Sequence, residues 1–386
     1  MGAAGGIPWR SAIRIPFCPN PKCIHHAETP RLAWYVTRGC YHTKLRGTIR
    51  RYRCLACNKS FSSQTFHTSY YLKRPGYFKD IFFRHAEAQS GLAIARATGL
   101  SFSSVQNRID RLSRQSLALH AALRPLASTR ESVCIDGFLS FSRSQFFPTE
   151  LTISITSASR FVLEISEATR RRSGNMTEEQ KMRAAVLYPG SELETGAIGR
   201  AFRDLLDTLQ LERPPSICNP LIIITDEKPQ YRSEIFRHSL FRNQDGKQRV
   251  IHHTVSSRLP RTSRNPLFAS NYLDRELRKD QANHHRETTC FTRNSANGMS
   301  RITCYMAWHN YWKRFLVKAP LKDGRVHADH AGIPPEQRRN RMKRFFSERM
   351  FLSHLKLTPP MERIWRKLTR TPGMDTPSYL PLFALS

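Results

Sequence analysis

Apolar runs of strand length and of helix length alternate through the middle of this 386-residue chain. Short runs rich in β-branched and aromatic residues are typical of buried strands, whereas apolar positions that recur every three or four residues are typical of helices. We predict strands over 133–138, 151–156, 161–165 and 221–225, and helices over 196–211 and from Tyr272 onward. This alternation indicates an α/β or α+β domain with a mixed sheet.

Ahead of this region, the pattern over 91–112 predicts two short helices with a turn at Gly99. Ser101 or Ser103 can cap the second helix. The apolar positions that would face each other across the turn are Leu92, Ala95, Val105 and Ile109. This arrangement is typical of a helix-turn-helix.

From about Pro334 the chain becomes rich in arginine, and proline clusters follow. We predict a basic helix there, followed by a partly disordered tail. A polar stretch before the first strand indicates a domain boundary near residue 130. The expected domains span 1–65, 66–130, which holds the helix pair, 131–320, which holds the sheet, and 321–386, which is the tail.

Charge indicates the class of partner. The chain carries 62 Lys and Arg against 30 Asp and Glu, a formal net charge of +32, which predicts a polyanionic partner such as double-stranded DNA. The first 130 residues hold 21 of the basic residues and 4 of the acidic ones, so we expect DNA to bind there. No apolar run is long enough for a membrane span and no export signal opens the chain, so we expect a cytoplasmic, nucleoid-associated protein.

Two cysteine pairs near the N-terminus have the spacing of a structural zinc site. Cys18 and Cys23 form the first pair, and Cys54 and Cys57 form the second. Thirty residues, with two strand-like segments among them, separate Cys23 from Cys54. Two such turns can offer four thiolates to one Zn²⁺, as in zinc ribbons. The alternatives are unpaired cysteines or an exposed redox pair at Cys54 and Cys57. Three further residues could replace a ligand, namely His25, His26 and Cys40.

The second helix of the predicted pair carries residue types that contact phosphates and base edges. We expect it to expose Ser104, Gln106, Asn107, Arg108 and Arg111. The alternative is an ordinary amphipathic helix pair without a DNA-reading role.

Acidic residues follow two of the predicted strands. Asp136 ends VCIDGF and Asp226 ends LIIITDE. Carboxylates at strand ends can converge to bind two divalent cations, Mg²⁺ or Mn²⁺, for attack on a phosphodiester. Three strands, a helix and a strand ending in an acid match the order of a ribonuclease H-like fold, whose third acid comes from a later helix.

That later helix offers four acids, Asp274, Glu276, Asp280 and Glu287. Residues two apart lie about 200° round a helix, so Asp274 and Glu276 cannot both face one pair of cations. Asp274 lies on one flank of the apolar stripe formed by Leu273 and Leu277. The other three acids lie near the opposite flank, and helical geometry leaves the choice open.

Together these features resemble bacterial insertion-sequence transposases of the DDE class. The resemblance covers about residues 18–315, and its most specific stretches are CPNPKC, RYRCLACNKSFS, NYLDRELRKDQANHHRETTCFTRN and YMAWHNYWK. It implies Asp136, Asp226 and Asp274 as the catalytic acids. A glutamate is commoner in the third position, which leaves Glu276 or Glu287 as alternatives. Residues that could contact the scissile phosphate or the DNA backbone are His284, His285 and Arg286.

The expected function is therefore that of a DNA transposase. The ribbon and the helix-turn-helix would bind terminal inverted repeats, the three acids would hold two Mg²⁺ or Mn²⁺ ions for strand cleavage and transfer, and the active complex would be a homo-oligomer. Two alternatives stay open: a DNA-binding regulator with a degenerate catalytic domain, and a metal-dependent nuclease without strand transfer.

Overall fold

The computed structural model describes residues 15–27, 33–242, 249–285, 289–316, 318, 324–374 and 376–386. The chain forms two compact units. The smaller unit combines Met1–Gly76 with Ser347–Leu355 and Pro381–Ser386, and the larger unit comprises Tyr77–Phe346 and Lys356–Leu380. The boundary that we expected near residue 130 therefore lies inside one unit. In the described part of the chain, no helix is long and apolar enough to cross a membrane.

The smaller unit is built on a three-stranded antiparallel sheet in the order β1-β2-β3. Its elements are α1 (Ile24–Ala27), β1 (Tyr35–Thr43), β2 (Gly47–Cys54), β3 (Ser60–Ser62) and the 3₁₀ turns η1 (Ser63–Phe66), η4 (Leu352–His354) and η5 (Leu382–Leu385). Trp34, Phe61, Phe66 and Phe351 are buried together with three cysteines. This core is small for a unit that folds on apolar burial alone.

The larger unit begins with three helices, α2 (Phe78–Ala86), α3 (Gly91–Thr98) and α4 (Phe102–Leu123). Gly99 ends α3 at φ 63°, a left-handed conformation that glycine adopts without strain. The Ser101 hydroxyl caps α4 by accepting the Ser104 N–H. The helix pair and its turn therefore form as predicted, except that Leu92 is 59% exposed instead of facing α4.

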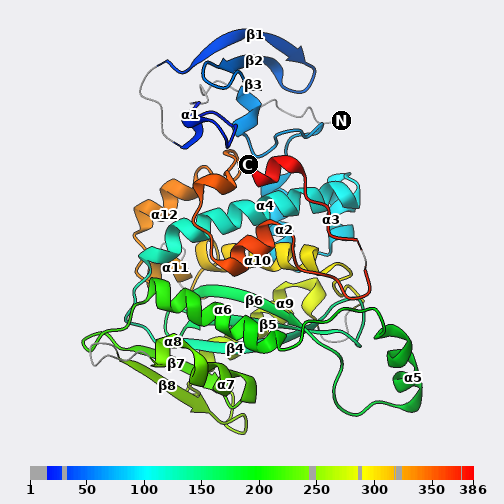
Figure 1. Ribbon diagram of the computed structural model, residues 1–386, viewed down its shortest axis with the longest axis vertical. Helices are drawn as coiled ribbons and strands as arrows, with labels where there is room; N and C mark the ends of the chain where they lie inside the picture. The colour runs from blue at the N-terminus through cyan, green and yellow to red at the C-terminus, as the bar shows by residue number, and fades with distance from the viewer. Residues whose placement is uncertain are drawn as a thin grey trace. The chain divides into compact units, whose positions relative to one another are not determined.

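A mixed five-stranded sheet follows, in the order β6-β5-β4-β7-β8 (Figure 1). The strands are β4 (Val133–Phe141), β5 (Pro148–Thr156), β6 (Val162–Thr169), β7 (Leu221–Asp226) and β8 (Val250–Val255). β4, β5 and β6 pair antiparallel, whereas β4, β7 and β8 pair parallel. The expectation of a multidomain α/β protein with a mixed sheet is confirmed.

Helices cover both faces of this sheet. Ser166 of β6 pairs with Thr152 of β5, which pairs with Gly137 of β4, so these three residues share one face of the sheet. On this face the Ser166 hydroxyl donates to Asp204 of α6 (Ala197–Glu212). Phe138 lies under Arg278 of α9 (Phe268–Asp280). Adjacent strand residues point to opposite faces, so α6 and α9 lie on opposite sides. The other elements of this region are η2 (Arg124–Leu126), α5 (Glu178–Leu187), α7 (Pro229–Arg237), α8 (Ser239–Arg242), η3 (Ala282–His284) and α10 (Ser295–Tyr311).

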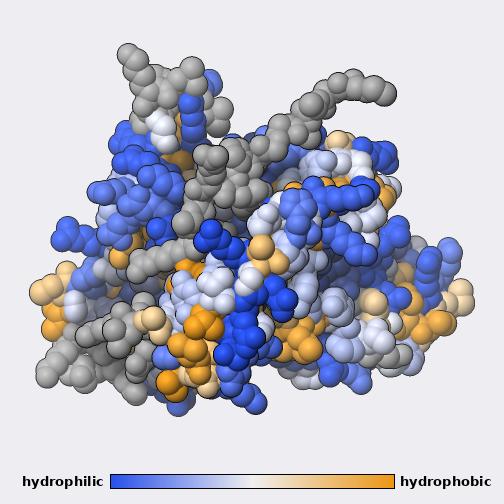
Figure 2. Space-filling model, turned by 90° about the horizontal axis from the view of Figure 1, so that it is seen from above, coloured by the Kyte–Doolittle hydropathy of each residue, from blue (hydrophilic) through white to orange (hydrophobic). Residues whose placement is uncertain are grey.

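The C-terminal part of the larger unit is folded, in contrast to the partly disordered tail that we expected. It contains α11 (His327–His330), α12 (Pro335–Met342) and α13 (Pro359–Trp365). Met361 and Trp365 of α13 are buried, and the Thr358 hydroxyl donates to Glu164 of β6 at 2.5 Å. The predicted basic helix is present as α12. The segment after it was expected to be partly disordered, but the apolar residues of α13 bury enough surface to fix it. Hydrophilic side chains cover much of the face seen in Figure 2.

Candidate functional site

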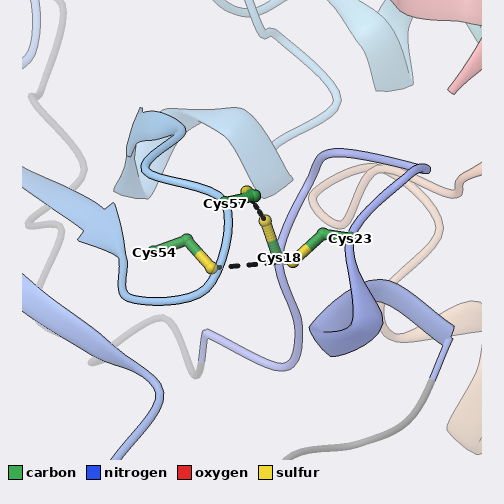
Figure 3. Close-up of side chains that lie close together, drawn as sticks. All are labelled: Cys18, Cys23, Cys54 and Cys57. Atoms are coloured by element: carbon green, nitrogen blue, oxygen red, sulfur yellow. Dashed lines mark hydrogen bonds between the residues drawn. The ribbon is translucent and has the colours of Figure 1, made fainter.

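Four cysteines of the smaller unit converge on one point. The sulfur atoms of Cys18, Cys23, Cys54 and Cys57 all lie within 4.8 Å of one another (Figure 3). Cys18 Sγ lies 3.6 Å from Cys57 Sγ, and Cys23 Sγ lies 3.7 Å from Cys54 Sγ. Sulfurs at the corners of a tetrahedron, each about 2.3 Å from a zinc ion, are about 3.8 Å apart. The cluster therefore matches a structural Zn²⁺ site in ligand type, number and spacing.

The residues considered as replacement ligands lie outside this cluster. His26 is buried, but its Nδ1 lies 2.6 Å from the Cys18 carbonyl oxygen and its Nε2 lies 2.5 Å from the Ser353 hydroxyl. Both ring nitrogens therefore already have partners. Cys40 is exposed on β1, and His25 packs against Trp34.

Without a cation, burial disfavours the thiolate form of these cysteines. It raises the pKa of Cys18 and of Cys23, and the Cys54 and Cys57 thiols add to the effect. Burial also acts upward on Cys57, but hydrogen bonds from the Asn20 side chain and the Lys59 backbone lower the pKa of that thiol to about 7. A bound cation stabilises all four thiolates, which couples metal binding to folding.

In the larger unit, strand register brings two of the predicted acids together. β4 and β7 run parallel, and their last registered pair is Ile135 opposite Thr225. One residue further along both strands, Asp136 lies beside Asp226, on strands about 4.8 Å apart. The Gly137 N–H donates to Asp136 Oδ1 at 2.7 Å, and the Lys228 N–H donates to Asp226 Oδ1 at 3.2 Å.

The third predicted acid, Asp274 of α9, lies near enough to Asp136 for the charge of that carboxylate to act on it. Burial and the charge of Asp136 raise the pKa of Asp274 to about 7. Burial and the charge of Asp226 raise the pKa of Asp136 to about 6. Among the described residues, no lysine, arginine or histidine forms an ion pair with any of the three carboxylates. The three carboxylates are partly exposed. The charges of Lys228, Arg278 and Arg261 act in part against the upward pKa shifts. The net effect is still a negative cluster, which a cation would stabilise.

The other acids of α9 are already paired with cations. Lys313 contacts Glu276 and lies 2.9 Å from Asp280, which also accepts the Tyr305 hydroxyl at 3.0 Å. Burial acts to raise the pKa of Glu276, but Lys313 and Lys279 lower it overall. These acids hold α9 against α10. The remaining alternative, Glu287, lies outside the described residues, as does Arg286.

The three aspartates are spread more widely than the cysteines. In the described ranges, the cysteine cluster is the one set of three or more His, Cys, Asp or Glu ligand atoms that all lie within 4.8 Å of one another. The aspartates therefore do not surround a single point.

The predicted DNA-reading residues of α4 are mostly buried, contrary to our expectation. Exposed fractions are 8% for Gln106, 3% for Arg108 and 7% for Arg111. Gln106 donates to Asp110 at 2.8 Å and Arg111 donates to Asn107 at 2.9 Å. α4 is 22 residues long and packs along α10. These polar side chains therefore form hydrogen bonds inside the unit instead of facing solvent. Ser104 and Asn107 are half-buried.

Two histidines that we considered for DNA contact differ in position. His284 is buried, with Nδ1 2.9 Å from the Ser140 hydroxyl and its ring against Phe138. It therefore belongs to the packing of α9 on β4. His285 is exposed.

Sequence reasoning missed a group beside the aspartates, formed by Glu150, Lys228 and Tyr231. Glu150 lies in β5 and is buried, while Lys228 and Tyr231 lie 78 and 81 residues further along the chain. One signal could have found it. Glu150 is the one charged residue in the strand PTELTISIT, and a charge in a buried strand needs a partner.

A groove of about 790 Å³ lies elsewhere in the larger unit, lined by residues 190–194 and 366–374 among others. None of the three aspartates lines it. Its basic residues have acidic partners, as in Lys367 with Asp110 and Arg370 with Glu192. The groove therefore offers little unpaired charge to an anion.

No model of a known protein family matches this sequence, and no curated protein matches it either.

Proposed function

We propose that this protein is a DNA strand-cleaving and strand-transferring enzyme of the transposase type, with a ribonuclease H-like domain. The observation that carries the proposal is the position of Asp136 beside Asp226 on neighbouring parallel strands, with Asp274 of α9 near Asp136. The sheet order, with three antiparallel strands joined to two parallel ones, agrees with that fold.

The three aspartates would hold two Mg²⁺ or Mn²⁺ ions. Hard carboxylate oxygens suit these cations, and the absence of an ion-pair partner for the three in the described part of the chain supports this use. The chemistry that two such ions supply is activation of a water or a 3′-hydroxyl, and stabilisation of the leaving oxygen. The protein's own part is to fix the carboxylates in place, through the backbone N–H groups of Gly137 and Lys228.

We propose that duplex DNA binds to the β1–β2 hairpin and not to α4, whose predicted DNA-reading residues are mostly buried. The chain has no acidic residue between Thr29 and Lys79. Arg38, Lys44, Arg50 and Arg51 are exposed along the hairpin. A two-stranded ribbon fits the major groove, and its cations would neutralise phosphates. The zinc ion would stabilise the base of the hairpin.

The test is strand cleavage of a duplex that carries the repeats flanking the gene, in Mg²⁺ or Mn²⁺. Asp136→Asn and Asp226→Asn should each lower the cleavage rate by orders of magnitude and leave DNA affinity nearly unchanged, because each removes one ligand charge and keeps its shape. Glu227→Gln is the matched control, since Glu227 is an exposed carboxylate next to Asp226. A wild-type chain that neither cleaves nor joins this duplex would favour the regulator alternative.

The same assay tests the third acid. Asp274→Asn should match the loss seen for Asp136→Asn, whereas Glu276→Gln should keep most of the activity, because Glu276 is paired with Lys313. The opposite pattern would replace Asp274 by Glu276 as the third ligand and leave the reaction type as proposed.

A further inference from the structure

Glu150 forms a buried ion pair behind the aspartates. Its side chain is 4% exposed, and Oε1 accepts hydrogen bonds from Lys228 Nζ at 2.8 Å and from the Tyr231 hydroxyl at 3.2 Å. Tyr231 is fully buried and stacks on Phe202 at 4.3 Å between ring centroids. Buried ion pairs often stabilise a fold no better than apolar residues of the same size. This pair therefore calls for a role other than stability.

Gly137 makes room for the Glu150 carboxylate. A Cβ atom at position 137 would lie 2.3 Å from Glu150 Oε1, far inside contact distance. The glycine is needed for this close approach, since its φ is not in the left-handed region. Its N–H donates to Asp136. One residue thus orients Asp136 and accommodates Glu150.

Lys228 links the same carboxylate to the second aspartate. Its ammonium binds Glu150, and its backbone N–H donates to Asp226 Oδ1. Together with the close approach of Glu150 to Gly137, these hydrogen bonds form a chain of neighbours from Asp136 through Gly137, Glu150 and Lys228 to Asp226. The chain connects β4, β5 and the turn between β7 and α7 next to the two aspartates.

We propose that Glu150 and Lys228 are positioning residues that fix the turn after β7 and so hold Asp226 beside Asp136 for cation binding. This inference rests on the proposed function, because it assigns the pair a role toward the proposed metal ligands. Groups that orient metal ligands typically change metal affinity by about 10- to 100-fold when removed.

The first experiment uses the zinc-loaded full-length chain and two measurements, amide hydrogen exchange over 226–232 and Mn²⁺ affinity by calorimetry. Glu150→Ala should speed exchange in this turn and weaken Mn²⁺ binding about tenfold or more. Glu150→Gln should stay much closer to wild type, because its amide oxygen still accepts from Lys228 and Tyr231. Glu179→Ala, which removes an exposed carboxylate on α5, should change neither measurement.

The second experiment tests the close approach. Gly137→Ala should reproduce the effects of Glu150→Ala, because the new methyl displaces the carboxylate. In the double variant that combines Gly137→Ala with Glu150→Ala, the new methyl meets no carboxylate. Its exchange rates and Mn²⁺ affinity should therefore match those of Glu150→Ala alone. Unchanged exchange in Glu150→Ala, or additive effects in the double variant, would overturn the proposal. If the wild-type chain binds no Mn²⁺, the proposed function fails, and the exchange data still decide whether the pair fixes the turn.

Discussion

Several histidines of the larger unit are buried, and each should make the stability of that unit sensitive to acid. His120 on α4 has Nδ1 2.8 Å from the Tyr311 hydroxyl and Nε2 2.8 Å from the Leu163 carbonyl oxygen. The carbonyl can only accept, so Nε2 carries the proton of the neutral ring. Burial, and then the charge of Arg124, lower the pKa of His120 to about 3. The same cause, burial, lowers the pKa of His85, His284, His309 and His327.

This gives a prediction about pH and stability. A histidine whose folded pKa is depressed contributes stability above its unfolded pKa of about 6.5, and that stability is lost as the pH falls toward the folded value. At pH 5 the unfolded chain gains about 2 kcal/mol from protonating His120. His120→Gln keeps a donor and an acceptor but does not titrate.

Urea unfolding of the larger unit at pH 7.5 and pH 5 measures the effect. The wild type should lose about 2 kcal/mol more than His120→Gln between these two pH values. His253→Gln, at an exposed position, controls for loss of an imidazole. Equal losses in the wild type and in His120→Gln would show that this buried ring does not contribute to the acid sensitivity.

At the scale of elements, the sequence predicted the sheet well because its strands are apolar runs with clear ends. All four predicted strands are present, with ends displaced by no more than four residues. Asp226 ends its strand as predicted, but Asp136 lies inside β4, which continues to Phe141. The two aspartates are adjacent because β4 and β7 pair parallel in this register. β8 was missed. Its sequence VIHHTV has two histidines, which weaken the apolar signal.

The errors concern contacts that only the tertiary fold creates. Gln106 looked like a surface residue, but it donates to Asp110 on its own helix and accepts from Arg301 of α10, 195 residues away. No local pattern reports such a partner. Glu150 and Lys228 meet for the same reason, across 78 residues. Paired polar groups in the interior therefore resemble surface residues in the sequence alone.

The zinc ribbon is the element with the clearest prediction. Cys57→Ser should abolish stoichiometric Zn²⁺ binding, because a serine hydroxyl stays protonated at neutral pH and three thiolates remain. Cys40→Ser is the matched control, since Cys40 is an exposed cysteine outside the cluster. Metal analysis of the purified full-length chains should find one Zn²⁺ in the wild type and in the control.

Limited proteolysis measures the structural consequence of losing the zinc ion. Without zinc, the segment from Tyr35 to Phe66 should become sensitive to protease, because metal binding supplies much of its folding energy. Full Zn²⁺ content in Cys57→Ser, or a wild-type chain without zinc, would exclude this assignment.

At the scale of the whole molecule, the first and last segments of the chain join in one unit. Phe351 is buried with Cys18, Cys23 and Cys54, although more than 290 residues separate it from the nearest of them. The cysteine cluster is thus packed among residues from both ends of the sequence. A division into consecutive domains, which the charge distribution suggested, could not anticipate this.

Net charge gives the last prediction, which concerns DNA binding by the full chain. Of the residues up to Gly76, 13 are Lys or Arg and one is acidic. Each phosphate that such a cation neutralises releases counterions, so log affinity should fall linearly with log salt concentration. Arg50→Ala and Arg51→Ala should each make this slope shallower by about 0.9, the value for one phosphate contact. Lys181→Ala should leave it unchanged, because Lys181 lies on α5 and is paired with Glu178. Filter binding or fluorescence anisotropy at several salt concentrations measures these slopes. A slope that changes in Lys181→Ala but in neither arginine variant would move the DNA surface from the β1–β2 hairpin to the larger unit.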